Sequence, residues 1–275
     1  MSGDRGPSDG TEGPPSLERM ADELFEAERT GVAIDPLSER YPSLSAEDAY
    51  AIQATNAARR GQAGQRHRGH KVGLTSAAMQ EMLGVNEPDF GTLFDAMFVD
   101  DHDAIDVSGL VAPRVESEIA FVLQDDLRGP GLSVSDVLRA TAGVTSAIEV
   151  IDSRIRDWRI TLVDTVADNG SSARVVLGGT LLPVDAIDLR VVGGLFSLNG
   201  AIVATGAGAA VLGHPARCVA WLANKLSEFG QHLAAGDVVM AGSIHKAFDV
   251  GPGDVATAEF DRLGAVTVRF TGAAT

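Results

Sequence analysis

Residues 113–123 read PRVESEIAFVL, which has the pattern of a β-strand. Side chains alternate between the two faces of a β-strand, so Glu116, Glu118 and Ala120 share one face. The face becomes apolar directly after the two glutamates, which indicates a strand that runs into a core. The glutamate pair then has two explanations: a strand end that meets solvent, or two carboxylates that a divalent cation neutralises.

Strand-like segments continue from this stretch in both directions. After Gly69, short β-branched runs are separated by Gly, Pro and Asp. They read HKVGLT, VESEIAFVL, SAIEVID, ARVVLGG, LRVVGGLFSLNG, AIVATG, GDVVMAG, DVATAEF and AVTVRF. Helical patterns cover residues 134–146 and 215–231, and Asn199 with Gly200 supplies a hairpin turn. We therefore expect an α+β fold, a mixed and largely antiparallel β-rich roll or barrel with flanking helices.

The first part of the chain has a different texture. Residues 1–15 are rich in Gly, Pro, Ser and acidic residues, a composition that predicts a disordered tail. Residues 16–68 place apolar side chains at helical spacing, and Ser45 with Asp48 has the pattern of a capping box. We expect an N-terminal helical region of two or three helices, followed by a β-rich main domain over residues 69–275.

The composition argues against several classes of function. A formal net charge of −16 without a block of Lys or Arg is unsuited to nucleic acid, because phosphate binding needs clustered cations. The single cysteine, Cys218, allows neither an intrachain disulfide nor a thiolate zinc site and suits a reducing compartment. No apolar run reaches the roughly 18 residues that span a bilayer, and the first residues lack the apolar centre of a signal peptide. We expect a cytoplasmic protein that binds a small molecule or another protein.

A third glutamate strengthens the cation interpretation. Glu149 lies in AIEVID, an otherwise apolar strand, where an isolated acid is either paired or a ligand. Together with Glu116 and Glu118 it would form a hard oxygen site, suited to Mg²⁺ or Mn²⁺. Asp152 is a competing ligand, and an ion pair with Arg154 explains it equally well.

At this point the chain resembles the 2-keto-4-pentenoate hydratase / 4-oxalocrotonate decarboxylase family, over about residues 45–270. The segments that carry the resemblance are GHKVGLTSAAMQEMLGVNEPDFGTLF, PRVESEIAFVL, AIEVIDSRIRDW, DTVADNGSSARVVLGG, GAGAAVLGHPARCVAWLAN and PGD. It implies the fold of the fumarylacetoacetate-hydrolase C-terminal domain and makes residues 69–275 the catalytic domain. It also implies a divalent metal held by a Glu-x-Glu pair and a more distant Glu, which correspond to Glu116, Glu118 and Glu149.

The resemblance further implies the chemistry. Family substrates are short 2-oxo or 2-hydroxy acids conjugated to an alkene, from meta-cleavage of aromatic rings, and the metal acts as a Lewis acid. We expect a hydro-lyase that adds water to a 2-hydroxypenta-2,4-dienoate-like substrate and gives a 4-hydroxy-2-oxo acid. The alternatives are a 4-oxalocrotonate-type decarboxylase and a non-catalytic partner subunit of such an enzyme. A homo-oligomer, and a complex with another enzyme of the pathway, are further expectations.

Five residues are the expected catalytic and orienting groups around this metal. Lys71, in GHKVGLTS, resembles the family's lysine and is the expected general acid or base. Its place beside a cation and away from water is expected to lower its pKa, since both disfavour the charged form. Asp89 is interpreted either as a turn residue or as a proton relay. Ser243 resembles a Gly-Ser loop near the family's site, and Thr75 and Ser76 are expected to orient the substrate.

Two further segments bear on the substrate. The loop DTVADNGSS can hydrogen-bond a substrate carboxylate, although hydrogen bonds within a turn explain its polar residues equally well. The substrate-binding candidates in it are Asp168, Asn169, Ser171 and Ser172. In the other segment His245 and Lys246 replace a smaller, Thr-containing stretch of the family, so their role and the native substrate stay open. Lys246 could bind a second carboxylate. His70 stands where the family usually has Tyr, and tuning Lys71 or neutral packing are equal explanations.

Overall fold

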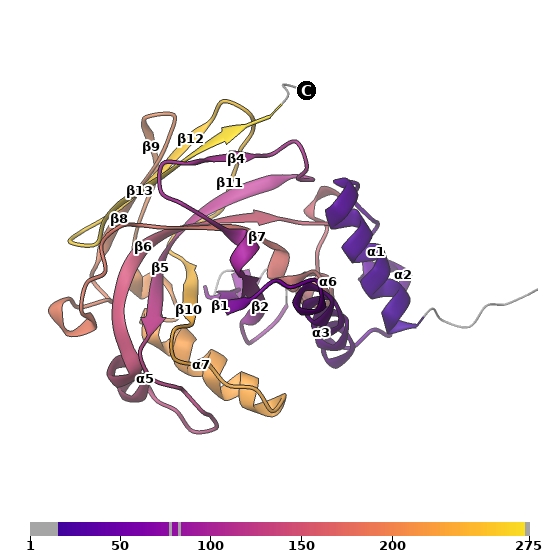
Figure 1. Ribbon diagram of the computed structural model, residues 1–275, viewed down its shortest axis with the longest axis horizontal. Coiled ribbons are helices and arrows are strands. Elements are labelled where there is room, and N and C mark those ends of the chain that lie inside the picture. The colour runs from indigo at the N-terminus through magenta and orange to yellow at the C-terminus, as the bar shows by residue number, and fades with distance from the viewer. Residues whose placement is uncertain (1–15, 77–78, 82–83, 273–275) are drawn as a thin grey trace, which may run out of the picture.

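The computed structural model describes residues 16–76, 79–81 and 84–272 of the chain. The predicted disordered tail, residues 1–15, lies outside the described residues. Within them the chain forms two β-sheets with helices around them, as Figure 1 shows. The predicted α+β class, with a curved, mixed and β-rich core, is confirmed.

The larger sheet contains residues 113–123, the strand with the two glutamates. Its strands are β1 (His67–Gly73), β2 (Asp89–Phe94), β3 (Phe98–Val99), β5 (Pro113–Leu123), β6 (Thr141–Asp152), β7 (Ser172–Leu177), β10 (Val238–Ser243) and β11 (Phe248–Asp249). They follow the order β2-β1-β10-β5-β6-β7-β3, and β11 pairs with the first part of β5. β5 and β6 pair antiparallel along their length, whereas β1 and β10 pair in parallel. The long, curved β6 therefore lies next to β5 at the centre of the sheet (Figure 1).

The smaller sheet packs against the larger one. Its strands, in spatial order, are β4 (Ala104–Asp106), β13 (Gly264–Thr271), β12 (Val255–Phe260), β8 (Gly193–Leu198) and β9 (Ala201–Ala207). β12 and β13 contact β6, and the fully buried rings of Phe196 and Phe270 belong to the resulting core. Asn199 (φ 53°) and Gly200 (φ 78°) form the tight turn between β8 and β9, which confirms the predicted hairpin.

Helices of the N-terminal region pack beside the larger sheet (Figure 1). They are α1 (Leu17–Thr30), α2 (Leu37–Arg40) and α3 (Ala46–Gln62), and α2 and α3 contact α6 (Leu162–Ala167). The predicted capping box begins α3, since Ser45 Oγ accepts from Asp48 N at 3.1 Å and Asp48 Oδ2 accepts from Ser45 N at 3.0 Å. Ser38 Oγ donates to Asp164 Oδ2 at 2.6 Å, so α2 is tied to the helix that leads into the polar loop.

The remaining helices are α5 (Val134–Ala140) and α7 (Pro215–Glu228), and they contact each other. Short 3-10 turns cover Asp95–Met97, Arg156–Trp158, Asn169–Ser171, Val184–Ala186 and Gly208–Ala210. The helix predicted over residues 134–146 is wrong beyond Ala140, because the β-branched residues that follow pair with β5 as β6 and are buried. In the part of the chain that the structure describes, no helix is long and apolar enough to cross a membrane.

Candidate metal centre and active site

The three predicted glutamate ligands meet on one face of the central strand pair. Glu116 of β5 stands directly opposite Glu149 of β6, and Glu118 lies two residues farther along β5 on the same face. One oxygen from each carboxylate lies within 4.8 Å of the others. Glu118 and Glu149 are buried and Glu116 is partly exposed, so the cluster lies at the inner end of an opening.

The electrostatics of this cluster call for a cation. Burial and the neighbouring Glu149 raise the pKa of Glu116 to about 7. Burial, with Glu149 and Glu116 next to it, raises the pKa of Glu118 well above its ordinary value. Burial also raises the pKa of Glu149, against the opposing charge of Lys71. Carboxylates so arranged fit a divalent ion that prefers oxygen ligands, because its charge removes their repulsion.

The hydrogen bonds of the cluster are consistent with that fit. Glu118 Oε2 accepts a bond from the backbone N of Gly242 at 2.7 Å, which fixes one of its oxygens. Neither oxygen of Glu149, fully buried in β6, accepts a hydrogen bond from the residues described. Buried carboxylate oxygens without partners are costly unless an ion binds them.

Lys71 lies on β1, which β10 separates from β5, and its side chain reaches the glutamate cluster. Its Nζ donates to the carbonyl oxygen of Gly170 at 2.8 Å and lies 3.7 Å from Glu149 Oε2. Two glycines make room for it: a Cβ on Gly73 would lie 3.2 Å from this Nζ, and one on Gly170 would lie 3.0 Å from its Cδ. Lys71 is 5% exposed, so its side chain is held in one place beside the glutamates.

The pKa of Lys71 differs from the sequence-based expectation. Burial acts to lower it, but the carboxylates of Glu149, Asp89 and Glu116 raise the pKa above its ordinary value. The expected lowering needed the charge of a cation, whereas the protein's own side chains around Lys71 are acidic. From its own residues alone, the site keeps this lysine protonated.

Asp89 lies next to Lys71 in the sheet. It pairs in register with Gly73, and a Cβ on that glycine would lie 2.1 Å from Asp89 Oδ1. Its Oδ2 accepts a hydrogen bond from Thr165 Oγ1 at 3.1 Å, while its buried Oδ1 has no partner among the described residues. Asp89 begins β2, which argues against the turn interpretation. Its unpartnered Oδ1 favours the proton-relay interpretation.

A cavity of about 490 Å³ opens onto this face. Six of the expected site residues line it together with Glu116: Lys71, Thr75, Ser76, Asp89, Ser171 and Ser243. Glu118 and Glu149 lie behind Glu116 and do not line it. Ile151, Trp158 and Ile160 add an apolar wall. The volume and the mixture of apolar wall and convergent polar groups are those of a small-molecule site.

Three of the expected substrate-binding residues are not brought to this cavity. Asp168 is bound by Arg154, whose Nε donates to its Oδ1 at 2.5 Å, and the ion pair is buried. Asn169 uses both ends of its amide on the backbone of Thr92, at 2.8 Å and 3.0 Å. Ser172 is buried without lining the cavity. These contacts of Asp168 and Asn169 reach distant segments and hold the loop in place, whereas Ser171 Oγ, which donates to Asp168 Oδ2 at 3.0 Å, forms a bond within the turn.

Hydrogen bonds of the Asp152 carboxylate distinguish between the two roles weighed for it, a metal ligand or a partner of Arg154. Both of its carboxylate oxygens accept from the backbone N of Val111 at 3.0 Å, and Oδ1 also accepts from Ala112 N at 2.7 Å. Arg154 donates only to its carbonyl oxygen, and the guanidinium pairs with Asp168. Of the two roles weighed for Asp152, the ion pair with the Arg154 side chain is not formed, and Asp152 anchors the turn before β5.

The loop after β10 shapes the outer part of the cavity. Ser243 Oγ donates to the carbonyl oxygen of His245 at 2.7 Å, so its hydroxyl closes the turn. His245 Nε2 lies 2.7 Å from Ser117 Oγ, and its ring packs 4.7 Å from that of Phe196. Lys246 Nζ lies over the ring of Phe248 at 5.3 Å. His245 is therefore a fixed wall, and Lys246 is a charged group on the rim.

Among the cavity residues that sequence reasoning missed, four have polar or aromatic side chains: Arg114, Trp158, Arg159 and Thr165. Arg114 carried a signal, because strand alternation places it on the face of Glu116 and Glu118. Trp158 and Arg159 carried none, since they reach the cavity through a turn in which Asp157 and Trp158 have positive φ. Their position depends on contacts with distant segments, such as the hydrogen bond from Trp158 Nε1 to Ala112 O at 3.0 Å.

The fold and this site together define a protein with a rolled mixed sheet and a carboxylate centre beside a buried lysine. The chain belongs to the family described as Fumarylacetoacetate (FAA) hydrolase C-terminal, which matches residues 67–271. The resemblance stated from the sequence is thereby confirmed.

Two relatives with assigned activities are similar to this chain over most of its length. A 2-keto-4-pentenoate hydratase of Paraburkholderia xenovorans (strain LB400) is 44% identical over 257 residues, 94% of this chain and 96% of that protein. A 4-oxalocrotonate decarboxylase of Pseudomonas putida is 41% identical over 251 residues, 91% of this chain and 95% of that protein.

A solved structure agrees with this chain over nearly its whole length. The 4-oxalocrotonate decarboxylase from Pseudomonas putida G7, complexed with magnesium and adipate, superposes with a TM-score of 0.90 at 39% identity. The match covers 92% of this chain and 97% of that one. A fumarylpyruvate hydrolase from Pseudomonas aeruginosa, with a TM-score of 0.62 at 18% identity over 75% of this chain and 90% of that one, shares the fold.

Proposed function

We propose that the protein is a metal-dependent hydro-lyase of the 2-keto-4-pentenoate hydratase type. It adds water to a 2-hydroxypenta-2,4-dienoate-like substrate and forms a 4-hydroxy-2-oxo acid, in the meta-cleavage catabolism of aromatic compounds. The observation that carries the proposal is the glutamate cluster, with unpartnered buried oxygens 3.7 Å from Lys71 at one end of a cavity of about 490 Å³. The hydratases among its relatives, at 40–48% identity, support the same reaction.

The cofactor is a divalent cation, Mg²⁺ or Mn²⁺. Glu116, Glu118 and Glu149 would hold it, because their oxygens are close together, hard and in need of neutralisation. When bound, it supplies Lewis acidity toward the oxygens at C1 and C2 of the substrate.

The protein's own residues handle the protons. In the net reaction C4 gains a hydroxyl group, C5 and C3 each gain a proton, and the C2 hydroxyl loses one. Lys71 lines the cavity and its Nζ lies 3.7 Å from Glu149 Oε2, so it is the donor toward carbon. Asp89 Oδ1, buried and without a described partner, can accept a proton from the attacking water.

The remaining cavity residues orient the substrate. The hydroxyl groups of Thr75 and Ser76 line the same cavity as Lys71 and can hydrogen-bond the carboxylate, whereas Ser171 Oγ already donates to Asp168 Oδ2 at 3.0 Å. Ile151, Ile160 and Trp158 form an apolar wall suited to the alkene end. Gly242 leaves room for Thr75, since a Cβ on this glycine would lie 2.2 Å from Thr75 Oγ1.

One observation favours a decarboxylase as the second candidate. Arg114, Arg159 and Lys246 line the outer cavity, where a second substrate carboxylate would find a cation. Two of them are already paired: Arg114 Nε lies 2.8 Å from Asp249 Oδ1, and Arg159 NH1 lies 2.9 Å from Glu39 Oε1. Lys246 forms no ion pair with a described residue, so it alone offers an uncommitted charge. Because two of the three cations are already paired, the hydratase remains the first candidate.

Turnover of two substrates separates the candidates. Purified protein is mixed with 2-hydroxypenta-2,4-dienoate or with 4-oxalocrotonate, the dicarboxylate substrate of the decarboxylase. Each reaction is run with Mg²⁺ and with excess chelator. We expect Mg²⁺-dependent loss of the dienol and formation of the 4-hydroxy-2-oxo acid. Faster CO₂ release from the dicarboxylate would assign the decarboxylase instead. No turnover of either substrate with bound metal would favour a non-catalytic partner subunit.

The assembly and location form the finer part of the proposal. Apolar side chains of Leu195, Ile202 and Val203 are exposed on the hairpin of β8 and β9, and β9 is an edge strand. Such a surface suits contact between copies of the chain, so we infer a homo-oligomer, and sedimentation or light scattering would measure its mass. The single buried thiol of Cys218 fits a reducing cytoplasm. A complex with another enzyme of the pathway would be tested by co-purification with that enzyme.

A further inference from the structure

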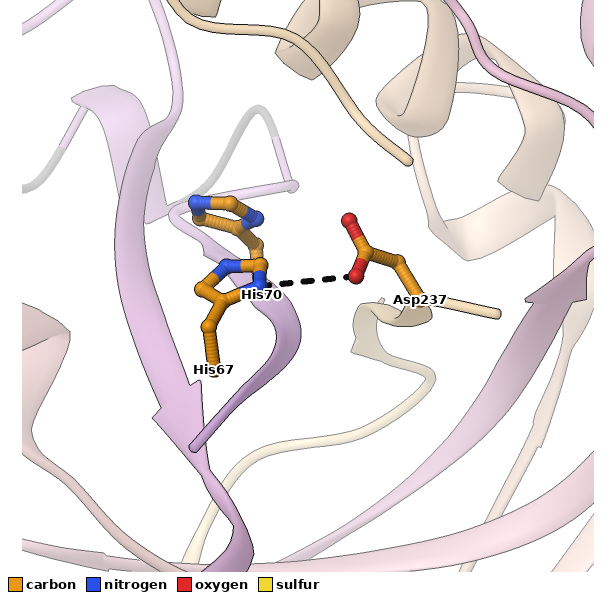
Figure 2. Close-up of side chains that lie close together, drawn as sticks. All are labelled: His67, His70 and Asp237. Carbon is orange, nitrogen blue, oxygen red and sulfur yellow. Dashed lines mark ion pairs between the residues drawn. The ribbon is translucent and has the colours of Figure 1, made fainter. Parts of the chain in front are cut away.

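A second cluster of ligand-type side chains lies where β10 begins beside β1. His67 and His70 come from β1, and Asp237 directly precedes β10. Figure 2 shows the three side chains facing one another, with His67 Nδ1 3.4 Å from Asp237 Oδ1. One ligand atom from each residue lies within 4.8 Å of the others.

A bulge in β1 explains why the two histidines meet. Residues three apart on a regular strand point to opposite faces of the sheet. Here the pairing with β2 shifts between His67 and Gly69, and Gly69 has a φ of 137°. A Cβ at Gly69 would lie 1.9 Å from the carbonyl oxygen of Val238, so only glycine lets β10 come this close. The bulge turns His67 toward His70 and brings Asp237 beside both.

One ring nitrogen of His70 has no hydrogen-bond partner among the described residues. The residue is 2% exposed and packs near the ring of Phe90, at 6.0 Å between centroids. Its Nδ1 is buried and has no hydrogen-bond partner among the described residues. Burial, with His67 next to it, lowers the pKa of His70 to about 3, so the ring is neutral and keeps a lone pair.

Asp237 is oriented for a shared ligand. Its Oδ2 accepts a hydrogen bond from the backbone N of Ala234 at 2.8 Å, which leaves Oδ1 directed at His67. Burial opposes ionisation, but the hydrogen bonds from His67 and Ala234 hold the pKa of Asp237 below its ordinary value. Asp237 therefore presents one carboxylate oxygen to the same space that the two imidazole rings face.

We propose that His67, His70 and Asp237 form a second metal site, for a transition ion such as Zn²⁺, separate from the glutamate cluster. Two imidazoles and a carboxylate suit Zn²⁺, Co²⁺ or Cu²⁺, whereas Mg²⁺ prefers oxygen alone. The 3.4 Å between His67 Nδ1 and Asp237 Oδ1 is the spacing of two ligands on a tetrahedral ion with bonds of about 2.0–2.1 Å.

The site has an access route and a structural consequence. His67 is 43% exposed at its side chain, so an ion can enter from solvent and keep water in its remaining position. Lys71 follows His70 directly and its side chain points to the other face of β1, into the cavity. The ion would therefore link β1 to β10 without taking part in the reaction.

Zn²⁺ titration of the tag-free full chain tests the proposal. The Glu149→Gln variant serves as the background, because it weakens the oxygen cluster and leaves the histidines intact. Isothermal titration is done on this background and on the same background with His67→Ala or Asp237→Asn. His102→Ala is the matched control, since His102 is also exposed and lies 3.6 Å from an aspartate, Asp101.

We expect one Zn²⁺ per chain in the background, at least about tenfold weaker binding with His67→Ala or Asp237→Asn, and no change with His102→Ala. Electron paramagnetic resonance with Cu²⁺ should show coupling to imidazole nitrogen, which His67→Ala reduces. Absence of Zn²⁺ binding in the background, or equal binding after His67→Ala, would overturn the proposal. His67 lies at the surface, so His67→Ala keeps the test open even if Asp237→Asn does not fold.

Discussion

Glu149 is a fully buried carboxylate with no hydrogen bond from the described residues to either oxygen. Replacing it with Gln removes one negative charge from a cluster in which burial and mutual repulsion raise the pKa of the neighbours. We predict that Glu149→Gln weakens Mn²⁺ binding at least about 100-fold and stabilises the metal-free protein by about 1–3 kcal/mol. Calorimetric titration and thermal melting in chelator measure the two effects.

The opposite signs of these two effects identify a metal ligand. A glutamate with only a structural role would destabilise the protein when replaced and leave Mn²⁺ binding unchanged. Glu259→Gln is the matched control, because Glu259 also lies in a β-strand but is exposed to solvent. It should change neither quantity.

Lys71 is the residue on which the proton transfer depends in the proposed function. We predict that Lys71→Ala lowers turnover by about 10² or more, the usual contribution of a general acid, while the metal still binds. Lys71→Arg should not restore activity, since the planar guanidinium is larger than the ammonium group and the space beside Gly73 and Gly170 is tight. Lys225→Ala, which changes a lysine paired with Glu228 on α7, is the control. Near wild-type turnover by Lys71→Ala would transfer the role to Asp89.

At the scale of elements, the contact of β1 with β10 depends on one glycine. Gly69 combines a φ of 137° with an approach to Val238 that leaves no room for a Cβ. We predict that Gly69→Ala destabilises the protein by at least about 2 kcal/mol, because backbone strain and the clash both act on the folded state. Denaturant unfolding measures the loss.

A second glycine provides the control for this element. Gly61 lies near the end of α3, and a Cβ there would meet nothing within 4 Å. Gly61→Ala should therefore stabilise the protein by about 0.5–1 kcal/mol, through helix propensity and a less flexible unfolded chain. Equal effects of the two substitutions would show that the approach of β10 is not tight.

At the scale of the whole molecule, the glutamate cluster couples stability to pH. The pKa of Glu116 rises from 4.5 in a solvated glutamate to about 7, and the pKa values of Glu118 and Glu149 also rise. Between pH 4.5 and 7 these glutamates thus bind more protons in the folded than in the unfolded state, so their contribution to stability falls as pH rises. We predict that metal-free protein loses a few kcal/mol between about pH 5 and pH 8.

Thermal melts across this pH range, with chelator and with Mg²⁺, measure the coupling. Bound Mg²⁺ should flatten or reverse the slope, since the ion favours the ionised carboxylates. Glu116→Gln should reduce the slope in chelator, because it removes a group that titrates. The lowered pKa of His70 acts in the opposite direction below about pH 6.5, so the comparison with Glu116→Gln decides: an equal slope in the two proteins in chelator would contradict the raised pKa of Glu116.

The sequence by itself determined the local features of this protein. Alternation along residues 113–123 placed Glu116 and Glu118 on one face, and the apolar run around Glu149 marked a third buried acid. The capping box at Ser45 and the turn at Asn199 also followed from local preferences. Such features depend on residues a few positions apart, whose geometry is set by the period of a strand or the end of a helix.

Tertiary structure alone decided what the strand order and loop contacts bring together. The order β1-β10-β5-β6 places Lys71 beside Glu149, and only the folded chain shows that Arg154 takes Asp168 as its partner. The end of α5 at Ala140 was set by the pairing of β6 with β5. The bulge at Gly69 joins two histidines that strand alternation would separate. These outcomes depend on register and packing between segments far apart in the chain, which local sequence periodicity does not encode.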